Sequence, residues 1–82
     1  MKFTKYFINR WQKPDRAWIK VEWIENVLNH PQHKQVQLDG RIRRWAAIPE
    51  ANNRYLRVVT LSDGETVHNA FFDRRFKPLT LK

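Results

Sequence analysis

The sequence predicts an α+β fold: two N-terminal helices packed on one face of a four-stranded antiparallel meander sheet. Two observations predict it. Apolar residues recur at helical spacing only in the N-terminal third, and from His33 onward the pattern changes to strands. Asp-Gly pairs at 39–40 and 63–64 are each flanked by strand-like sequence, which is the strongest short-range signal of a hairpin.

The 82-residue chain has room for a single domain. We expect the helices at about 4–30, the sheet at about 33–72 and a basic tail at 73–82. So small a domain buries only about 60–65% of the surface of its unfolded chain, so its core needs large side chains. Four Trp, five Phe and two Tyr can supply them.

Residues 4–12 are expected to form a short helix in which Tyr6 and Arg10 share one face. An opening strand is the alternative, because several aromatic and β-branched residues in this segment favour strands. Pro14 ends either element.

The clearest helix ends at Pro31. Val21, Ile24 and Leu28 recur at helical spacing and form its apolar stripe. Its start lies between residues 15 and 20, because Asp15 is a good N-cap but the helical pattern begins only near residue 20.

The expected strands are joined by the two Asp-Gly turns and by a middle turn at residues 50–53. They are residues 33–38, 41–48, 54–62 and 65–72.

The turn at residues 63–64 sets the register of the second hairpin if its loop has two residues. The face buried under the helices would then pair Thr60 with Val67, Val58 with Asn69 and Leu56 with Phe71. The opposite face would pair Val59 with His68, Arg57 with Ala70 and Tyr55 with Phe72. We therefore expect His68 and Arg57 to be diagonal neighbours that point away from the core.

The strand at 41–48 is unusually basic. Arg41, Arg43 and Trp45 share one face of it, and Arg44 lies on the other. One interpretation is that the arginine stems cover apolar surface while their charged ends stay in water. The other is a basic strand with an aromatic residue, which holds a phosphate backbone and stacks a base.

The net charge is +8, from 16 Lys and Arg against 8 Asp and Glu. This excess points to nucleic acid, an acidic protein or an anionic membrane surface as a partner. Arginine predominates among the basic residues of the second half, which suits bidentate phosphate contacts.

Several classes of function are disfavoured. The chain has no cysteine, no apolar run that could span a membrane and no signal-peptide pattern, so we expect a cytoplasmic protein without a membrane role. His30 and His33 lack a third ligand nearby, and two glycines cannot build a phosphate-binding loop. We expect neither a metal nor a cofactor.

Four features together resemble the small toxin domains related to RelE, ParE and BrnT. They are the pair Tyr6 and Arg10, the helix end at 24–31, the Asp-Gly-Arg turn at 39–41 and the Leu-Arg-Val-Val strand at 56–59. The resemblance covers roughly residues 6–72. It implies a helix pair on a twisted antiparallel sheet, metal-independent cleavage of RNA, including ribosome-bound mRNA, and an acidic antitoxin partner. The related domains often carry His near position 6, where this chain has Tyr6.

Cleavage of this type uses the 2′-hydroxyl as nucleophile and needs a base, an acid and cations around the phosphate. His68 is the candidate base or acid, because its ordinary pKa lies near neutrality, and Arg57 is the candidate phosphate ligand. The further candidates for contact with nucleic acid are Tyr55, Arg41, Arg43, Arg44, Arg74 and Arg75.

Two other functions fit the same residues. One is a nucleic-acid-binding module without catalysis, which uses the arginines and does not need His68. The other is an adaptor whose basic face receives an acidic protein. In either case His68 is an exposed strand residue without a functional role.

In the tail, Phe76 and Leu79 predict partial docking on the sheet, whereas the charges suit a mobile arm.

Overall fold

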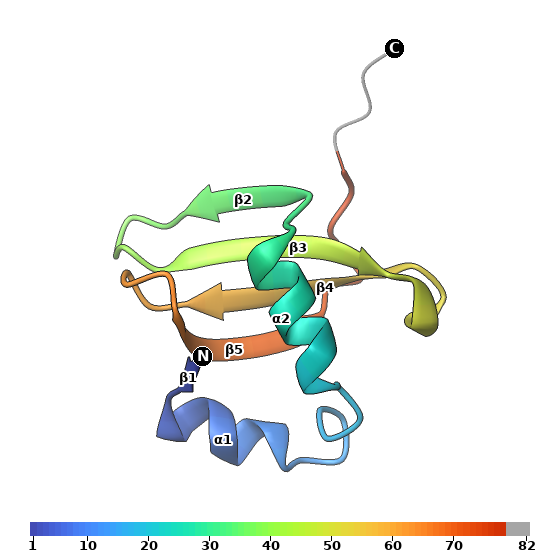
Figure 1. Ribbon diagram of the computed structural model, residues 1–82, viewed down its shortest axis with the longest axis horizontal. Coiled ribbons are helices and arrows are strands. Elements are labelled where there is room, and N and C mark those ends of the chain that lie inside the picture. The colour runs from blue at the N-terminus through green and yellow to red at the C-terminus, as the bar shows by residue number, and fades with distance from the viewer. Residues whose placement is uncertain (79–82) are drawn as a thin grey trace.

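The computed structural model describes residues 1–78 as an α+β domain built on one five-stranded sheet (Figure 1). In chain order its elements are β1 (Lys2–Phe3), α1 (Lys5–Trp11), α2 (Val21–Asn29), β2 (His33–Val36), β3 (Ile42–Ile48), a 3-10 turn (Pro49–Ala51), β4 (Arg54–Thr60) and β5 (Thr66–Phe72). Among these residues, neither helix has the length and apolar character that a membrane span requires.

The sheet differs from the predicted four-stranded antiparallel meander, which was wrong in strand number and in being wholly antiparallel. Its strand order is β1-β5-β4-β3-β2, and β2 to β5 form the predicted meander. The N-terminal Lys2–Phe3 adds a short fifth strand parallel to β5, so the sheet is mixed. The backbone N–H of Thr4 extends this pairing by donating to the carbonyl of Val67 at 3.0 Å.

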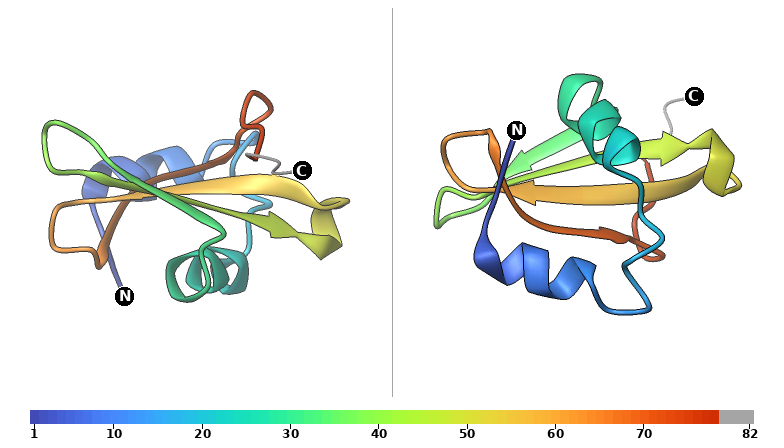
Figure 2. Two further views of the ribbon diagram at one scale, coloured as in Figure 1. Left: turned by 90° about the horizontal axis from the view of Figure 1, so that it is seen from above. Right: turned by 60° about the horizontal axis from the view of Figure 1, so that its bottom comes forward.

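The two helices occupy different positions, which refines the predicted pair on one face. α2 crosses one face of the sheet and contacts β3 and β4, whereas α1 lies along the edge beside β5 (Figures 1 and 2). Thr4 caps α1 by accepting a hydrogen bond from Phe7 N at 3.1 Å. Phe7, which is fully buried, brings α1 into the core beneath α2.

The core lies between α2 and the face of the sheet that α2 covers. β4 contributes Leu56 and Val58, and α2 contributes Ile24 and Val27, all of which are fully buried. Strand alternation explains the two β4 residues, because residues two apart on a strand share a face, and helical spacing explains the two α2 residues.

A β-bulge corrects the predicted register of the second hairpin. Thr60 does face Val67, as predicted, but the pairing shifts by one residue between Val59 and Thr60. From there on Val59 faces Asn69, and His68 is the extra residue of β5. The other predicted pairs are therefore wrong, since Val58 faces Ala70, Arg57 faces Phe71 and Leu56 faces Phe72.

The shift moves side chains between faces. Ala70 and Phe72 lie with the core, whereas Asn69 and Phe71 lie on the face away from α2. Asn69, expected on the buried face, is on the other one, where its Oδ1 accepts hydrogen bonds from Arg16 Nη1 and from the backbone N–H of Ala70.

Candidate nucleic-acid interface

The face of the sheet away from α2 carries a row of rings and cations. Cross-strand pairing places Trp45 of β3, Arg57 of β4 and Phe71 of β5 side by side. The guanidinium carbon of Arg57 lies 5.6 Å from the ring centre of Trp45 and 5.0 Å from that of Phe71. Both distances are within cation–π range, so the two rings hold the guanidinium in place. We call this side of the sheet the arginine face.

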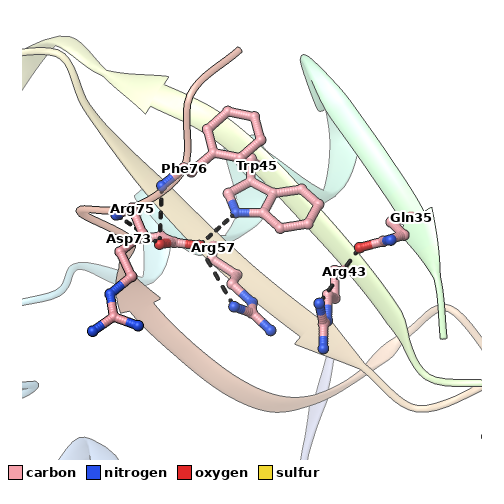
Figure 3. A network of polar contacts seen from close by, with 7 residues as sticks. All are labelled: Gln35, Arg43, Trp45, Arg57, Asp73, Arg75 and Phe76. Carbon is pink, nitrogen blue, oxygen red and sulfur yellow. Dashed lines mark hydrogen bonds and ion pairs between the residues drawn. The ribbon is translucent and has the colours of Figure 1, made fainter. Parts of the chain in front are cut away.

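The turn that follows β5 folds onto the arginine face through Asp73 (Figure 3). One carboxylate oxygen of Asp73 accepts from Trp45 Nε1 at 3.0 Å and from Arg57 Nη1 at 3.5 Å. The other accepts from the backbone N–H groups of Arg75 and Phe76 at 3.1 and 3.2 Å. Burial alone would raise the pKa of Asp73, but these hydrogen bonds and the charge of Arg57 lower the pKa below its ordinary value.

Phe76 is brought over the sheet by this turn. Its ring stacks on Trp45 with centres 4.8 Å apart and also contacts Tyr55 at 5.0 Å. Trp45 is only 4% exposed as a result. Phe76 therefore docks on the sheet, which is one of the two alternatives that the sequence left open for the tail, while Leu79 lies outside the described residues.

Two further arginines, Arg16 and Arg43, approach the same face. Arg16, from the segment between the helices, lies over Phe71 at 5.2 Å and donates to Asn69 Oδ1 at 2.8 Å. Burial, and then the charge of Arg10, lowers the pKa of Arg16. Burial, and then the charge of Arg43, lowers the pKa of Arg57. The physical cause in both cases is that a guanidinium group is partly withdrawn from water and has another positive charge nearby.

The arginine face is short of anions and acceptors. Among the described residues, the carboxylates that pair with its arginines are Asp73, with Arg57, and Asp15, with Arg16 at 3.6 Å. Arg43 has only a long contact of 3.4 Å to Gln35 Oε1. Within residues 1–78, the buried Nε atoms of Arg10, Arg43 and Arg57 have no hydrogen-bond partner. Buried donors without acceptors are unfavourable. Guanidinium groups with so few acceptors in the protein favour an anion at those N–H groups that remain accessible.

His68 lies apart from this row, at the seam with β1 and α1. Its Nδ1 is 3.2 Å from the hydroxyl of Thr4, and its ring stacks on Tyr6 at 4.9 Å. Burial, and then the charge of Arg41, lowers the pKa of His68 below its ordinary value, which favours the neutral form of the imidazole. The diagonal contact predicted between His68 and Arg57 depended on the register that the bulge replaces, and within residues 1–78 no hydrogen bond or ring contact joins them.

The other predicted residues are distributed over both faces. Arg43 and Tyr55 lie on the arginine face, but Arg44 points to the α2 side and donates to Thr60 Oγ1 at 3.2 Å. Arg41 pairs with Asp39 in the first turn at 3.7 Å. Arg74 and Arg75 are exposed in the turn after β5.

The sequence prediction missed Arg16, Asp73 and Phe71 as parts of this site. Arg16 lies outside any helix or strand, so no periodicity could place it on a face. Phe71 was assigned to the wrong face because the bulge was not predicted.

No protein family, curated protein or solved structure matches this chain. The resemblance to the RelE-like toxins thus stays a prediction.

Proposed function

We propose that the arginine face binds single-stranded RNA. The observation that carries the proposal is the row of Trp45, Arg57 and Phe71, flanked by Arg16 and Arg43, whose guanidinium groups outnumber the carboxylates paired with them. Phosphate oxygens are suitable acceptors for such groups, because guanidinium binds them in a bidentate manner.

A single strand fits this face better than a duplex does. The cations are accompanied by the rings of Tyr55, Phe71 and Phe76, each of which is partly exposed. Unpaired bases stack on such rings whatever their sequence, whereas the bases of a duplex are already stacked on one another. The net charge of +8 would favour association and make the affinity fall with salt.

The test compares two adjacent arginines of β3. Arg43 lies on the arginine face, while Arg44 lies on the α2 side. Arg43→Gln and Arg44→Gln remove the same charge, so long-range electrostatics change equally. We expect Arg43→Gln to weaken binding of a fluorescent single-stranded oligoribonucleotide and to reduce the slope of log affinity against log salt by about 0.7, the value for one lost phosphate contact. Arg44→Gln is expected to retain most of the affinity and the slope.

Equal losses in the two variants would contradict the assignment of this face. If neither variant nor the wild-type protein retained RNA, the basic face would be assigned instead to an acidic protein, such as the antitoxin that the toxin resemblance implies.

Metal-independent RNA cleavage is a second candidate function, favoured by the state of His68. A neutral imidazole accepts a proton, and Tyr6 stacked against it could donate one.

Cleavage is tested with mixed RNA in the presence of a chelator. We expect loss of cutting in His68→Ala and retention in His30→Ala, a control at the exposed end of α2. Retention of cutting in His68→Ala would remove His68 from the reaction. Absence of cutting in the wild-type protein, with RNA still bound, would leave a binding module.

A further inference from the structure

A cavity of about 500 Å³ opens beside the arginine face, where β4 and β5 meet the segment between the helices. Its volume is within the range of about 300–1,000 Å³ that is usual for small-molecule sites. Five aromatic side chains line it: Trp18, Tyr55, Phe71, Phe72 and Phe76. A cavity with walls of this kind is suited to a flat, aromatic ligand.

One wall is a fixed aromatic platform. The indole of Trp18 stacks on Phe72 with ring centres 4.9 Å apart and planes 9° apart. The guanidinium carbon of Arg54 lies 5.2 Å from the centres of both rings. Trp18 Nε1 donates to the carbonyl of Asp15 at 3.1 Å, which holds the indole in this orientation.

Trp18 nevertheless remains 43% exposed. An indole that is held rigidly and left open to water loses little conformational entropy when a second ring stacks on it. The Trp18 platform is therefore preorganised for stacking with a ligand ring.

The cavity and the arginine face share a wall. Phe71 lines the cavity and also lies under the guanidinium groups of Arg57 and Arg16. Asp73 likewise lines the cavity and pairs with Arg57. A strand whose phosphates lie on the arginines would thus bring a neighbouring base to the cavity.

We infer that this cavity takes one unpaired nucleobase of the bound RNA, stacked on Trp18 and Arg54. The inference rests on the proposed function and deepens it. The arginine face would hold the sugar–phosphate chain irrespective of its bases, and the cavity would require that at least one base be present and free of pairing.

The experiment uses two probes of equal length on the full chain: a fluorescent single-stranded oligoribonucleotide and an abasic sugar–phosphate oligomer. We expect the wild-type protein to bind the base-bearing probe about tenfold more tightly, which corresponds to about 1.4 kcal/mol of stacking. Trp18→Leu should abolish this preference and leave the affinity for the abasic probe unchanged. Arg43→Gln should weaken both probes equally.

A second variant tests the same preference independently, in case Trp18→Leu fails to fold. Arg54→Lys keeps the charge but removes the planar guanidinium, so it should reduce the preference for bases and leave the abasic affinity unchanged. Equal affinity of the wild-type protein for the two probes would overturn the cavity inference while the proposed function stood. Equal losses on both probes in Trp18→Leu and Arg54→Lys would overturn it as well, and failure to bind either probe would overturn both proposals.

Discussion

The two faces of the sheet are built from alternate residues of the same strands, yet they differ in kind. On the α2 side, Leu56 and Val58 of β4 are fully buried against helix and core. On the arginine face, the intervening Arg57 is held between two rings and has a buried Nε without a partner among the described residues. The residues of the first face are buried by packing within the chain. The guanidinium groups of the second face have more hydrogen-bond donors than the described part of the chain supplies acceptors.

This difference separates the residues that stabilise the fold from those available for binding. Apolar burial is the main favourable term in folding, and the α2 side supplies most of it. The arginine face keeps positive charges close together, an arrangement that lowers stability unless an anion is present. A site that costs stability in the free protein is a reasonable place to expect a ligand.

The largest effect is expected on the α2 side. Leu56→Ala removes a fully buried side chain and leaves a cavity, which should lower the free energy of unfolding by about 2–5 kcal/mol. Urea denaturation would measure the change. The control is the neighbouring Tyr55→Phe on the arginine face, which removes only a hydroxyl and should change stability by less than about 0.5 kcal/mol. Similar losses in the two variants would contradict the division of roles between the faces.

The meander and the α2 side could be predicted from sequence because local rules determine them. Asp-Gly at residues 63–64 placed the second hairpin, and the pairing of Thr60 with Val67 next to the turn is as predicted. The apolar stripe of α2 identified the helix that covers the core.

The arginine face was less predictable because its contacts are between residues far apart in the chain. The bulge at His68 is accompanied by contacts to Thr4 and Tyr6, and no local pattern reports these. β1 has two residues, too few to show an alternation. Asp73, which fell in the predicted tail, joins Trp45 and Arg57 only because the chain turns back after β5.

The next largest effect is expected at Asp73. Asp73→Asn keeps one acceptor oxygen but cannot serve all four donors now bound, so stability should fall by about 1–3 kcal/mol. Binding of single-stranded RNA should become tighter, because the carboxylate that competes with phosphate for Arg57 is gone. Urea denaturation and fluorescence anisotropy would measure the two changes. A parallel loss of stability and affinity would show instead that the turn itself supports binding.

The control for this variant is the pH dependence of its stability relative to the wild-type protein. Because the pKa of Asp73 is lowered in the folded state, the unfolded chain binds more protons below about pH 4, and the stability that Asp73 contributes is lost as pH falls through the folded pKa. The difference between wild type and Asp73→Asn should therefore be full at pH 7 and shrink toward zero in acid. Asp63, whose pKa is lowered to about 2, chiefly by the Thr66 hydroxyl, affects both proteins equally. A difference that did not change with pH would contradict a role for the Asp73 charge.

The smallest effect concerns a polar contact between the neighbouring strands β3 and β4. Thr60 is the only buried polar residue among those described, and its hydroxyl accepts from Arg44 Nη1 at 3.2 Å. Thr60→Val should cost about 0.5–1.5 kcal/mol, the usual net value of a hydrogen bond. In a double-mutant cycle with Arg44→Gln, most of this loss should disappear, because the donor is then altered already. Additive losses would mean that this contact contributes nothing to stability, and that Thr60 is tolerated in the core without help from Arg44.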